Sequence, residues 1–184
     1  VFVLESAKGA WKQDAEFNER INPADNTTMR RYQAIGAMEA VKFTTDENGT
    51  ALAQPVNLLL ASVWDRRKDL EVFVRDTAGT WTKTTIVPAA DSASNWNVRS
   101  IAMHHDTVTN ADVVLVGTSG DEKNPRGIFH GVYDATAPGK IKWIRPRETW
   151  DTVPNPGDRV MSIDNAGGKA YATVCGKVYE RVDG

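Results

Sequence analysis

Two adjacent histidines and an aspartate form the most metal-like cluster of the sequence: His104, His105 and Asp106. Imidazole and carboxylate groups are common ligands of zinc and of other divalent ions. Neighbouring side chains of a strand point to opposite faces, so both imidazoles reach one ion only if the chain bends there. We therefore expect a loop that follows a strand and leaves the histidines solvated. A divalent-cation site at these three residues is the alternative.

Opposite charges at Glu39 and Arg99 form a second candidate site. The internal repeat described below gives these two residues, together with Met161, equivalent places on the innermost strands of three units. An ion pair between neighbouring sheets is the expected arrangement. In the alternative, the two side chains bind a polar ligand or a metal-bound water at a central channel, where Asp164 adds a second carboxylate.

Tryptophan is abundant, with six residues in the chain. Three of them recur at one position of the repeat, where packing between units explains them. Trp64, Trp96 and Trp150 do not belong to the repeat. Aromatic rings flanked by polar groups bind sugar rings, so these three residues are the candidates for a ligand-binding surface.

The sequence lacks the known catalytic fingerprints. It contains no Gly-x-Ser-x-Gly, His-Glu-x-x-His, phosphate-binding loop or dinucleotide-binding motif. We therefore expect no nucleotide cofactor, and a divalent cation is the one cofactor that stays open. The motifs do not decide whether the protein is an enzyme.

Composition limits the partners that the protein can have. Of its 184 residues, 41% are hydrophobic and 25% are charged, and the formal net charge is -2. A nucleic-acid-binding domain needs a basic excess, so we expect no nucleic-acid partner. No apolar run approaches the roughly 18 residues of a membrane span. Two glycosylation sequons, which begin at Asn26 and Asn48, slightly favour an extracellular or secreted protein.

An internal repeat organises the chain. Short valine-led segments begin at Val1, Val72, Val132 and Val178, and each of them pairs valine with phenylalanine or tyrosine within a strand-like run. Two apolar strands precede each of the last three segments, and a turn-rich link with a tryptophan-bearing strand follows each of the first three. The tryptophan strands lie at residues 9–13, 79–83 and 140–144.

The repeat unit is predicted to be a four-stranded antiparallel meander. Its first two strands are apolar throughout, which indicates burial on both faces, and its fourth strand alternates polar and apolar residues. This gradient is expected where sheets stack face to face around an axis, as in a β-propeller. A β-sandwich would give each strand one polar face. We therefore predict an all-β fold made of β-propeller blades.

The repeat predicts a single partial propeller over residues 1–184. Residues 1–13 would end one blade, residues 35–87 and 97–146 would form two blades, and residues 159–184 would begin another. A propeller needs at least four blades to close. We expect the remainder to come from a longer chain or from self-association of copies.

Two family resemblances follow from these segments. The run Arg159-Val160-Met161-Ser162-Ile163 and the run from Gly176 through Val178-Tyr179-Glu180 to Gly184 resemble β-propeller repeats of largely uncharacterised proteins. Asp76, Thr80 and Trp81 keep the spacing of the Asp-box hairpin of sialidase-like propellers, although Val74 and Ala78 depart from its pattern. Both resemblances imply a fold, and the box is a structural turn in that family.

Two functions remain after these exclusions. The first is a non-enzymatic recognition module that presents the loops of one propeller rim to a glycan or a protein. The alternative is a metal-assisted propeller hydrolase or lactonase, with an ion over the central channel.

Overall fold

The computed structural model describes residues 2–4, 11–17, 34–64, 70–87, 97–119, 127–144, 160–174 and 176–183. The chain forms two compact units, Val1–Gln33 and Ala34–Gly184. In the smaller unit, β1 (Phe2–Leu4) pairs antiparallel with β2 (Trp11–Gln13). A single helical turn at residues 15–17 follows, and Asp14 Oδ1 accepts a hydrogen bond of 3.0 Å from the Phe17 N–H at its start.

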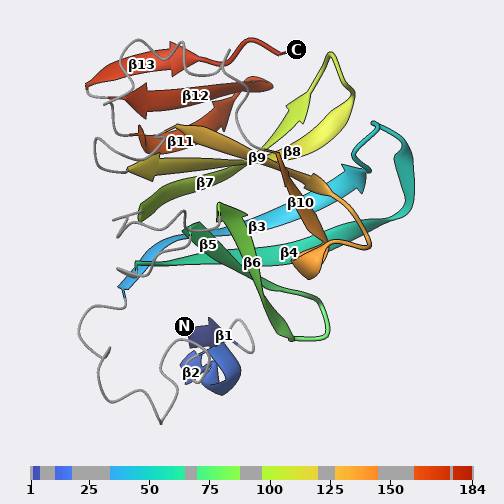
Figure 1. The fold of residues 1–184 in the computed structure, drawn as a ribbon, viewed down its shortest axis with the longest axis vertical. Coiled ribbons are helices and arrows are strands. Elements are labelled where there is room, and N and C mark those ends of the chain that lie inside the picture. Colours follow the sequence, from blue (N-terminus) through green and yellow to red (C-terminus); the bar gives the residue numbers. More distant parts are fainter. Residues whose placement is uncertain are drawn as a thin grey trace. The chain divides into compact units, whose positions relative to one another are not determined.

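Three antiparallel sheets make up the larger unit, and each runs in simple chain order (Figure 1). The first sheet comprises β3 (Ala34–Thr45), β4 (Ala51–Trp64), β5 (Leu70–Arg75) and β6 (Trp81–Val87). The second sheet comprises β7 (Asn97–Asp106), β8 (Ala111–Ser119), β9 (Ile128–Tyr133) and β10 (Ile141–Ile144), with a 3₁₀ turn η1 (Pro138–Lys140) before its last strand. The third sheet comprises β11 (Val160–Ala166), β12 (Lys169–Val174) and β13 (Lys177–Glu180). The predicted all-β fold of four-stranded antiparallel meanders is confirmed. No helix in the described part of the chain is long and apolar enough to cross a membrane.

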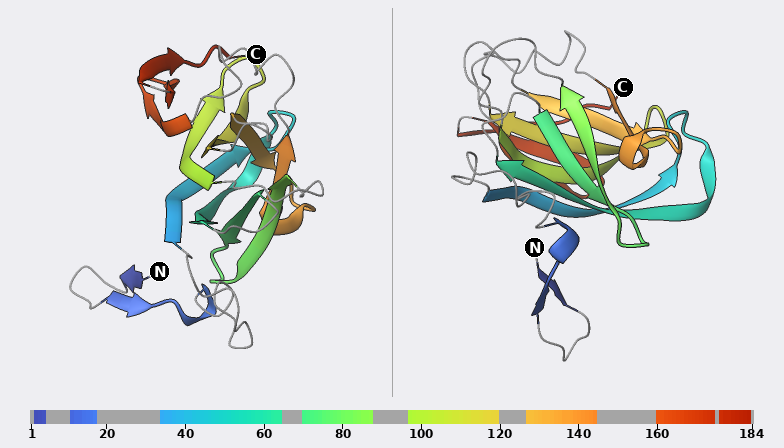
Figure 2. Two further views of the ribbon diagram at one scale, coloured as in Figure 1. Left: turned by 60° about the vertical axis from the view of Figure 1, so that its left-hand side comes forward. Right: turned by 60° about the horizontal axis from the view of Figure 1, so that its bottom comes forward.

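The second sheet lies between the other two, and Figure 2 shows the same stacking from two further directions. Alternation along β8 sends Val114 and Val116 into the core shared with the first sheet, and Val113 and Leu115 into the core shared with the third. Burial on both faces explains why the central run of this strand, Val113 to Val116, is apolar throughout. Each fully buried aliphatic side chain of this kind contributes about 1.5 to 3 kcal/mol to folding.

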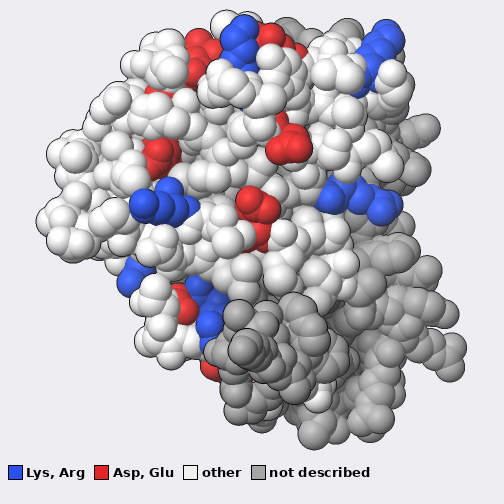
Figure 3. All heavy atoms as spheres, turned by 180° about the vertical axis from the view of Figure 1, so that it is seen from behind, with Lys and Arg blue, Asp and Glu red and all other residues white. Residues whose placement is uncertain are grey.

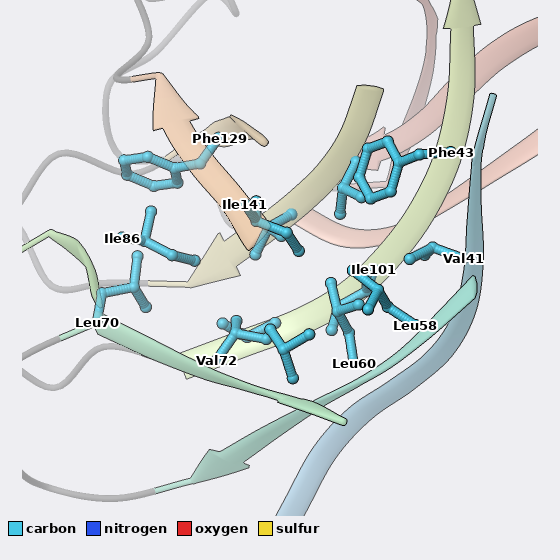
Figure 4. Packing of buried hydrophobic residues seen from close by; sticks show 14 residues of the cluster. Val41, Phe43, Leu58, Leu60, Leu70, Val72, Ile86, Ile101, Phe129 and Ile141 are labelled. Carbon is cyan, nitrogen blue, oxygen red and sulfur yellow. The ribbon is translucent and has the colours of Figure 1, made fainter. Parts of the chain in front are cut away.

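The core between the first and second sheets is the larger one, and Figure 4 shows it from close by. Phe43 and Leu60 from the first sheet and Phe129 from the second are fully buried or nearly so. Trp143 packs at the edge of this core, and its indole N–H donates a 2.8 Å hydrogen bond to Thr84 Oγ1 of the neighbouring sheet. The recurring tryptophan therefore joins one sheet to the next at this position.

Two close approaches bring the inner strands of neighbouring sheets together. A Cβ atom at Gly36 of β3 would lie 2.5 Å from the Val98 carbonyl oxygen of β7. A Cβ at Gly117 of β8 would lie 2.5 Å from Val160 Cγ1 of β11. Glycine is needed at both positions because real Cβ contacts are never this short.

In the larger unit, the first strand of each of the three sheets carries a β-bulge, and these bulges fix which residues are equivalent. The pairing register shifts around Gly36 in β3, Arg99 in β7 and Met161 in β11. The predicted equivalence of Arg99 and Met161 therefore holds, but Glu39 does not belong with them. Counting from the bulges instead aligns Glu39 with Asp164, which pair with Leu60 and Tyr171 of their second strands.

The third strands also align differently from the sequence prediction. Phe73 pairs with Ala61 in the first sheet, and Phe129 and Tyr179 hold the corresponding places in the other two. The predicted anchor Val132-Tyr133 lies on the same strand but closer to its end than Phe129 does. The intervals from Phe73 to Phe129 and from Phe129 to Tyr179 are then more even than the predicted ones.

Antiparallel order divides the strand ends between two rims. The short described turns that follow β3, β5, β7, β9 and β11 share one rim. Asp46 and Asp76 cap two of these turns: each carboxylate accepts a 2.9 Å hydrogen bond from the N–H four residues later. Gly49 and Gly79 provide the positive φ angles of 75° and 92° that these turns require. The residues that match an Asp-box thus form a turn in this protein as well.

Candidate functional site

The structure places the predicted metal cluster on a strand. His104, His105 and Asp106 are the last residues of β7, so the prediction of a solvated loop is wrong. His104 and Asp106 face the third sheet and are buried, whereas His105 faces the first sheet and its side chain is 47% exposed. The two imidazoles therefore point apart, as alternation on a strand requires. Among the described residues, no group of three His, Cys, Asp or Glu side chains is arranged to hold a metal ion.

Each histidine instead contacts its own carboxylate. His104 Nε2 lies 2.8 Å from Asp183 Oδ1, which belongs to the segment after β13. His105 Nδ1 lies 2.9 Å from Asp112 Oδ1 in β8. The cluster is thereby divided between two polar networks, one on each side of the second sheet.

The network between the second and third sheets centres on a buried guanidinium. Arg181 donates hydrogen bonds to Asp106 and to Asp183, and its side chain is only 8% exposed. Asp183 Oδ2 also accepts the N–H and the Oγ–H of Thr107, at 2.9 and 2.8 Å. One arginine, two carboxylates and one imidazole thus join the end of β13 to the end of β7.

The two aspartates of this network are held in their charged form. Burial by itself raises the pKa of Asp106, but hydrogen bonds from the Thr109 backbone and from Arg181 outweigh it and lower that pKa. Asp183 follows the same balance: burial opposes ionisation, and hydrogen bonds from Thr107 and His104 lower its pKa well below the usual range.

His130 of β9 lies beside this network and is held neutral. Burial is the main cause that lowers its pKa to about 4, and the positive charge of Arg181 adds to the effect. The structure places His130 half-buried in β9.

A second polar network joins the first and second sheets. Asp112 Oδ2 accepts the Oγ–H of Thr44 at 2.6 Å, the Thr44 N–H, and the Thr45 N–H at 3.2 Å. In return, the Asp112 N–H donates a 2.7 Å hydrogen bond to Thr45 Oγ1. Burial raises the pKa of Asp112, but the hydrogen bonds from Thr44 and His105 lower it by more. Nearby, Asn110 Nδ2 donates to the Gly49 carbonyl at 2.9 Å and so links the two hairpin turns.

Glu39 and Arg99 occupy different registers of their strands. Arg99 is the exposed bulge residue of β7, and Glu39 is half-buried further along β3. Burial raises the pKa of Glu39, and the negative charge of Asp164 raises it further. The charge that acts on Glu39 is therefore that of another carboxylate, Asp164 of β11, which is exposed.

The described strand ends that adjoin the three candidate tryptophans lie at the rim opposite the short turns. The side chain of Trp64 and all of Trp96 and Trp150 lie outside the described residues. The backbone of Trp64 ends β4 opposite Ala34, and Trp96 directly precedes the start of β7. The link that contains Trp150 joins the end of β10 to the start of β11.

Several residues of the two networks were missed by sequence reasoning. No polar contact was expected for Thr44, Thr107, Asp112, Arg181 or Asp183, and the hydrogen bonds by which they join one sheet to another span more than 60 positions of the sequence. Such a pairing depends on how the sheets stack, so the residue types alone do not indicate it.

The fold defines an all-β protein of stacked antiparallel, blade-like sheets with polar clamps between them. Comparison with protein-family models, with curated proteins and with solved structures finds no match for this chain. The function must therefore be argued from the chain's own residues.

Proposed function

We propose that this protein is a glycan-recognition module whose sheets are blades of a β-propeller. The stacked sheets supply a rigid body, and the rim opposite the short turns supplies the binding surface. Recognition needs no catalytic group, and both buried polar networks are used to join the sheets.

One observation supports the proposal: the described strand ends that adjoin Trp64, Trp96 and Trp150 in the sequence lie at the same rim. Ala34 pairs with Trp64, and the approach of Gly36 to Val98 places the start of β3 against the start of β7, directly after Trp96. The link with Trp150 begins and ends at this rim, because both β10 and β11 have an end there. The end of β4, the start of β7, the end of β10 and the start of β11 are thus at the same rim, although they are far apart in the sequence.

The charge distribution supports a neutral or weakly charged ligand. Acidic and basic side chains alternate over the face shown in Figure 3 and do not gather into a patch of one sign. Tryptophan rings bind sugars through their apolar faces and place polar groups at the rim of the ligand. A chain with a formal net charge of -2 and six tryptophans suits this chemistry.

The test is binding to a panel of immobilised neutral and sialylated oligosaccharides, measured for the chain and for three single variants. We expect Trp64→Ala, Trp96→Ala or Trp150→Ala to weaken binding by about 2 kcal/mol or more where the ring contacts the sugar. Val108→Ala is the control, since Val108 is 68% exposed on the opposite rim.

The outcomes separate the alternatives. Loss of binding in the tryptophan variants with retention in Val108→Ala supports the proposal. Equal binding by all variants places the site elsewhere, and failure of every oligosaccharide together with capture of a defined protein ligand replaces glycan recognition by protein recognition.

A metal-assisted hydrolase is the second candidate, and the interaction between Glu39 and Asp164 is the observation that favours it. These carboxylates occupy equivalent places on β3 and β11, and burial together with the negative charge of Asp164 raises the pKa of Glu39. Titration calorimetry with Ca²⁺, Mn²⁺ and Zn²⁺ tests this function. Binding that Glu39→Gln abolishes would support it, and absence of binding for all three ions would remove it.

A further inference from the structure

The face of the first sheet that points away from the second sheet contains a shallow groove of about 310 Å³. The groove is lined by side chains of β3, β4 and β5, among them Lys42, Asn57, Leu59 and Arg75. Lys42 and Asn57 are exposed and Leu59 is half-buried. On the same face, towards the outer strands, Phe73 is buried. On the outermost strand β6, Lys83 and Thr85 of this face are exposed as well.

The corresponding face of the second sheet packs against another sheet, and so shows what kind of partner such a surface can bind. Counting from the bulges at Gly36 and Arg99, Lys42 corresponds to His105, and the residues paired with them, Asn57 and Asp112, correspond as well. Asp112 is the residue that accepts hydrogen bonds from the N–H and Oγ–H groups at the end of β3. In the second sheet this face is covered by the inner strands of the preceding sheet.

We infer that the groove around Asn57 is a docking surface for the inner strand pair of another sheet of the same repeat. That pair presents, at the end of its first strand, a threonine whose N–H and Oγ–H donate to Asn57 Oδ1 as Thr44 donates to Asp112. Leu59 packs against apolar residues of that strand pair, as Val114 of the second sheet packs into the core shared with the first sheet. The inference does not depend on the glycan ligand proposed above.

A second copy of this chain does not supply the partner strand pair. Thr44 and Thr107 hold equivalent places at the ends of β3 and β7, and both already donate to carboxylates of the following sheet. The third sheet ends its first strand at Ala166 and turns at Gly167, so it has no threonine there. The docking strand pair is therefore different from the three described in this chain.

Lysine footprinting of the protein from its natural source, kept in its native assembly, tests the inference. An acetylating reagent is applied under native conditions, and mass spectrometry compares Lys42 in the groove with Lys177, which is exposed on β13. We expect Lys42 to react at least about tenfold more slowly than Lys177, because a covered side chain reacts only when the interface opens. Equal rates would overturn the inference.

Crosslinking from Lys42 with an amine-reactive reagent then identifies the partner. A crosslinked strand that ends in threonine, from outside the three described sheets, supports the inference. A crosslink to a second copy of residues 34–183 contradicts it. Asn57→Asp keeps an acceptor and is expected to retain the partner, whereas Asn57→Leu removes the acceptor and is expected to release it, which a purely apolar docking surface would not do.

Discussion

Thr44 and Thr107 occupy equivalent positions at the ends of β3 and β7, and both clamp the next sheet through a carboxylate. Thr44 Oγ1 lies 2.6 Å from Asp112 Oδ2, and Thr107 Oγ1 lies 2.8 Å from Asp183 Oδ2. The acceptors come from different places, since Asp112 begins β8 and Asp183 follows β13. The threonine therefore recurs at the same position of the repeat, whereas the carboxylate that it contacts comes from a different part of the following sheet in each case.

Thermodynamic coupling between Thr44 and Asp112 follows from this geometry. Asp112→Ala is expected to lower the free energy of unfolding by about 2 to 3 kcal/mol, because it leaves buried donors of β3 without their acceptor. Thr44→Val should cost about 1 kcal/mol, and the double variant should cost less than the sum. Chemical denaturation of the four proteins measures the coupling. Thr109→Val is the control, since its exposed side chain lies outside the clamp. Strict additivity would show that the two side chains do not interact in solution.

Arg181 is predicted to be the most sensitive residue of the network between the second and third sheets. Arg181→Met leaves the carboxylates of Asp106 and Asp183 buried without their cation, which typically costs about 3 to 5 kcal/mol. Thermal and denaturant unfolding report the loss. Lys177→Met, an exposed cation on the same sheet, should change the free energy of unfolding by less than about 0.5 kcal/mol. Similar effects of the two substitutions would contradict a structural role for the buried guanidinium.

The fold follows from patterns that lie close together in the sequence, and the polar networks do not. The unbroken apolar run from Val113 to Val116 of β8 and the alternation along β6 indicate stacked meanders, because the pleat repeats every two residues. The bulges at Gly36, Arg99 and Met161 shift the register without changing the apolar pattern. The sequence alignment therefore misplaced Glu39. His104 was expected in solvent because nothing near it indicates that Asp183 closes over it.

Acidification is expected to destabilise the protein in two steps. His130 is neutral in the folded state because its pKa lies near 4, whereas in the unfolded chain it takes up a proton near pH 6.5. The unfolded state therefore binds more protons between these values, and stability falls as the pH decreases through this window, by on the order of 3 kcal/mol. Asp106, Asp112 and Asp183 have lowered pKa values, so their contribution is present above the unfolded pKa of about 3.9 and is lost below it.

Unfolding experiments between pH 3 and 8 on the wild-type chain and on His130→Phe separate the two steps. The variant should lose the change above pH 4 and keep the one below it. NMR titration of the His130 ring gives its pKa directly. A value near 6.5 would remove the first step and, with it, the explanation that burial and Arg181 keep the ring neutral.

The close contact between Gly117 and Val160 leads to the last prediction. A Cβ at residue 117 would lie 2.5 Å from Val160 Cγ1 and 3.2 Å from Ile163 Cδ1, so Gly117→Ala forces the second and third sheets apart. Overpacking of this kind costs about 1 to 3 kcal/mol in the free energy of unfolding. Adding Val160→Ala removes the clashing methyl group, so the double variant should be less destabilised than the two single changes together. Gly36→Ala meets the Val98 carbonyl oxygen instead, where no side chain can be trimmed, and it should be the more damaging substitution. Calorimetric melting of the four variants checks the order, and a double variant as unstable as the sum would show that Val160 does not set the spacing between the sheets.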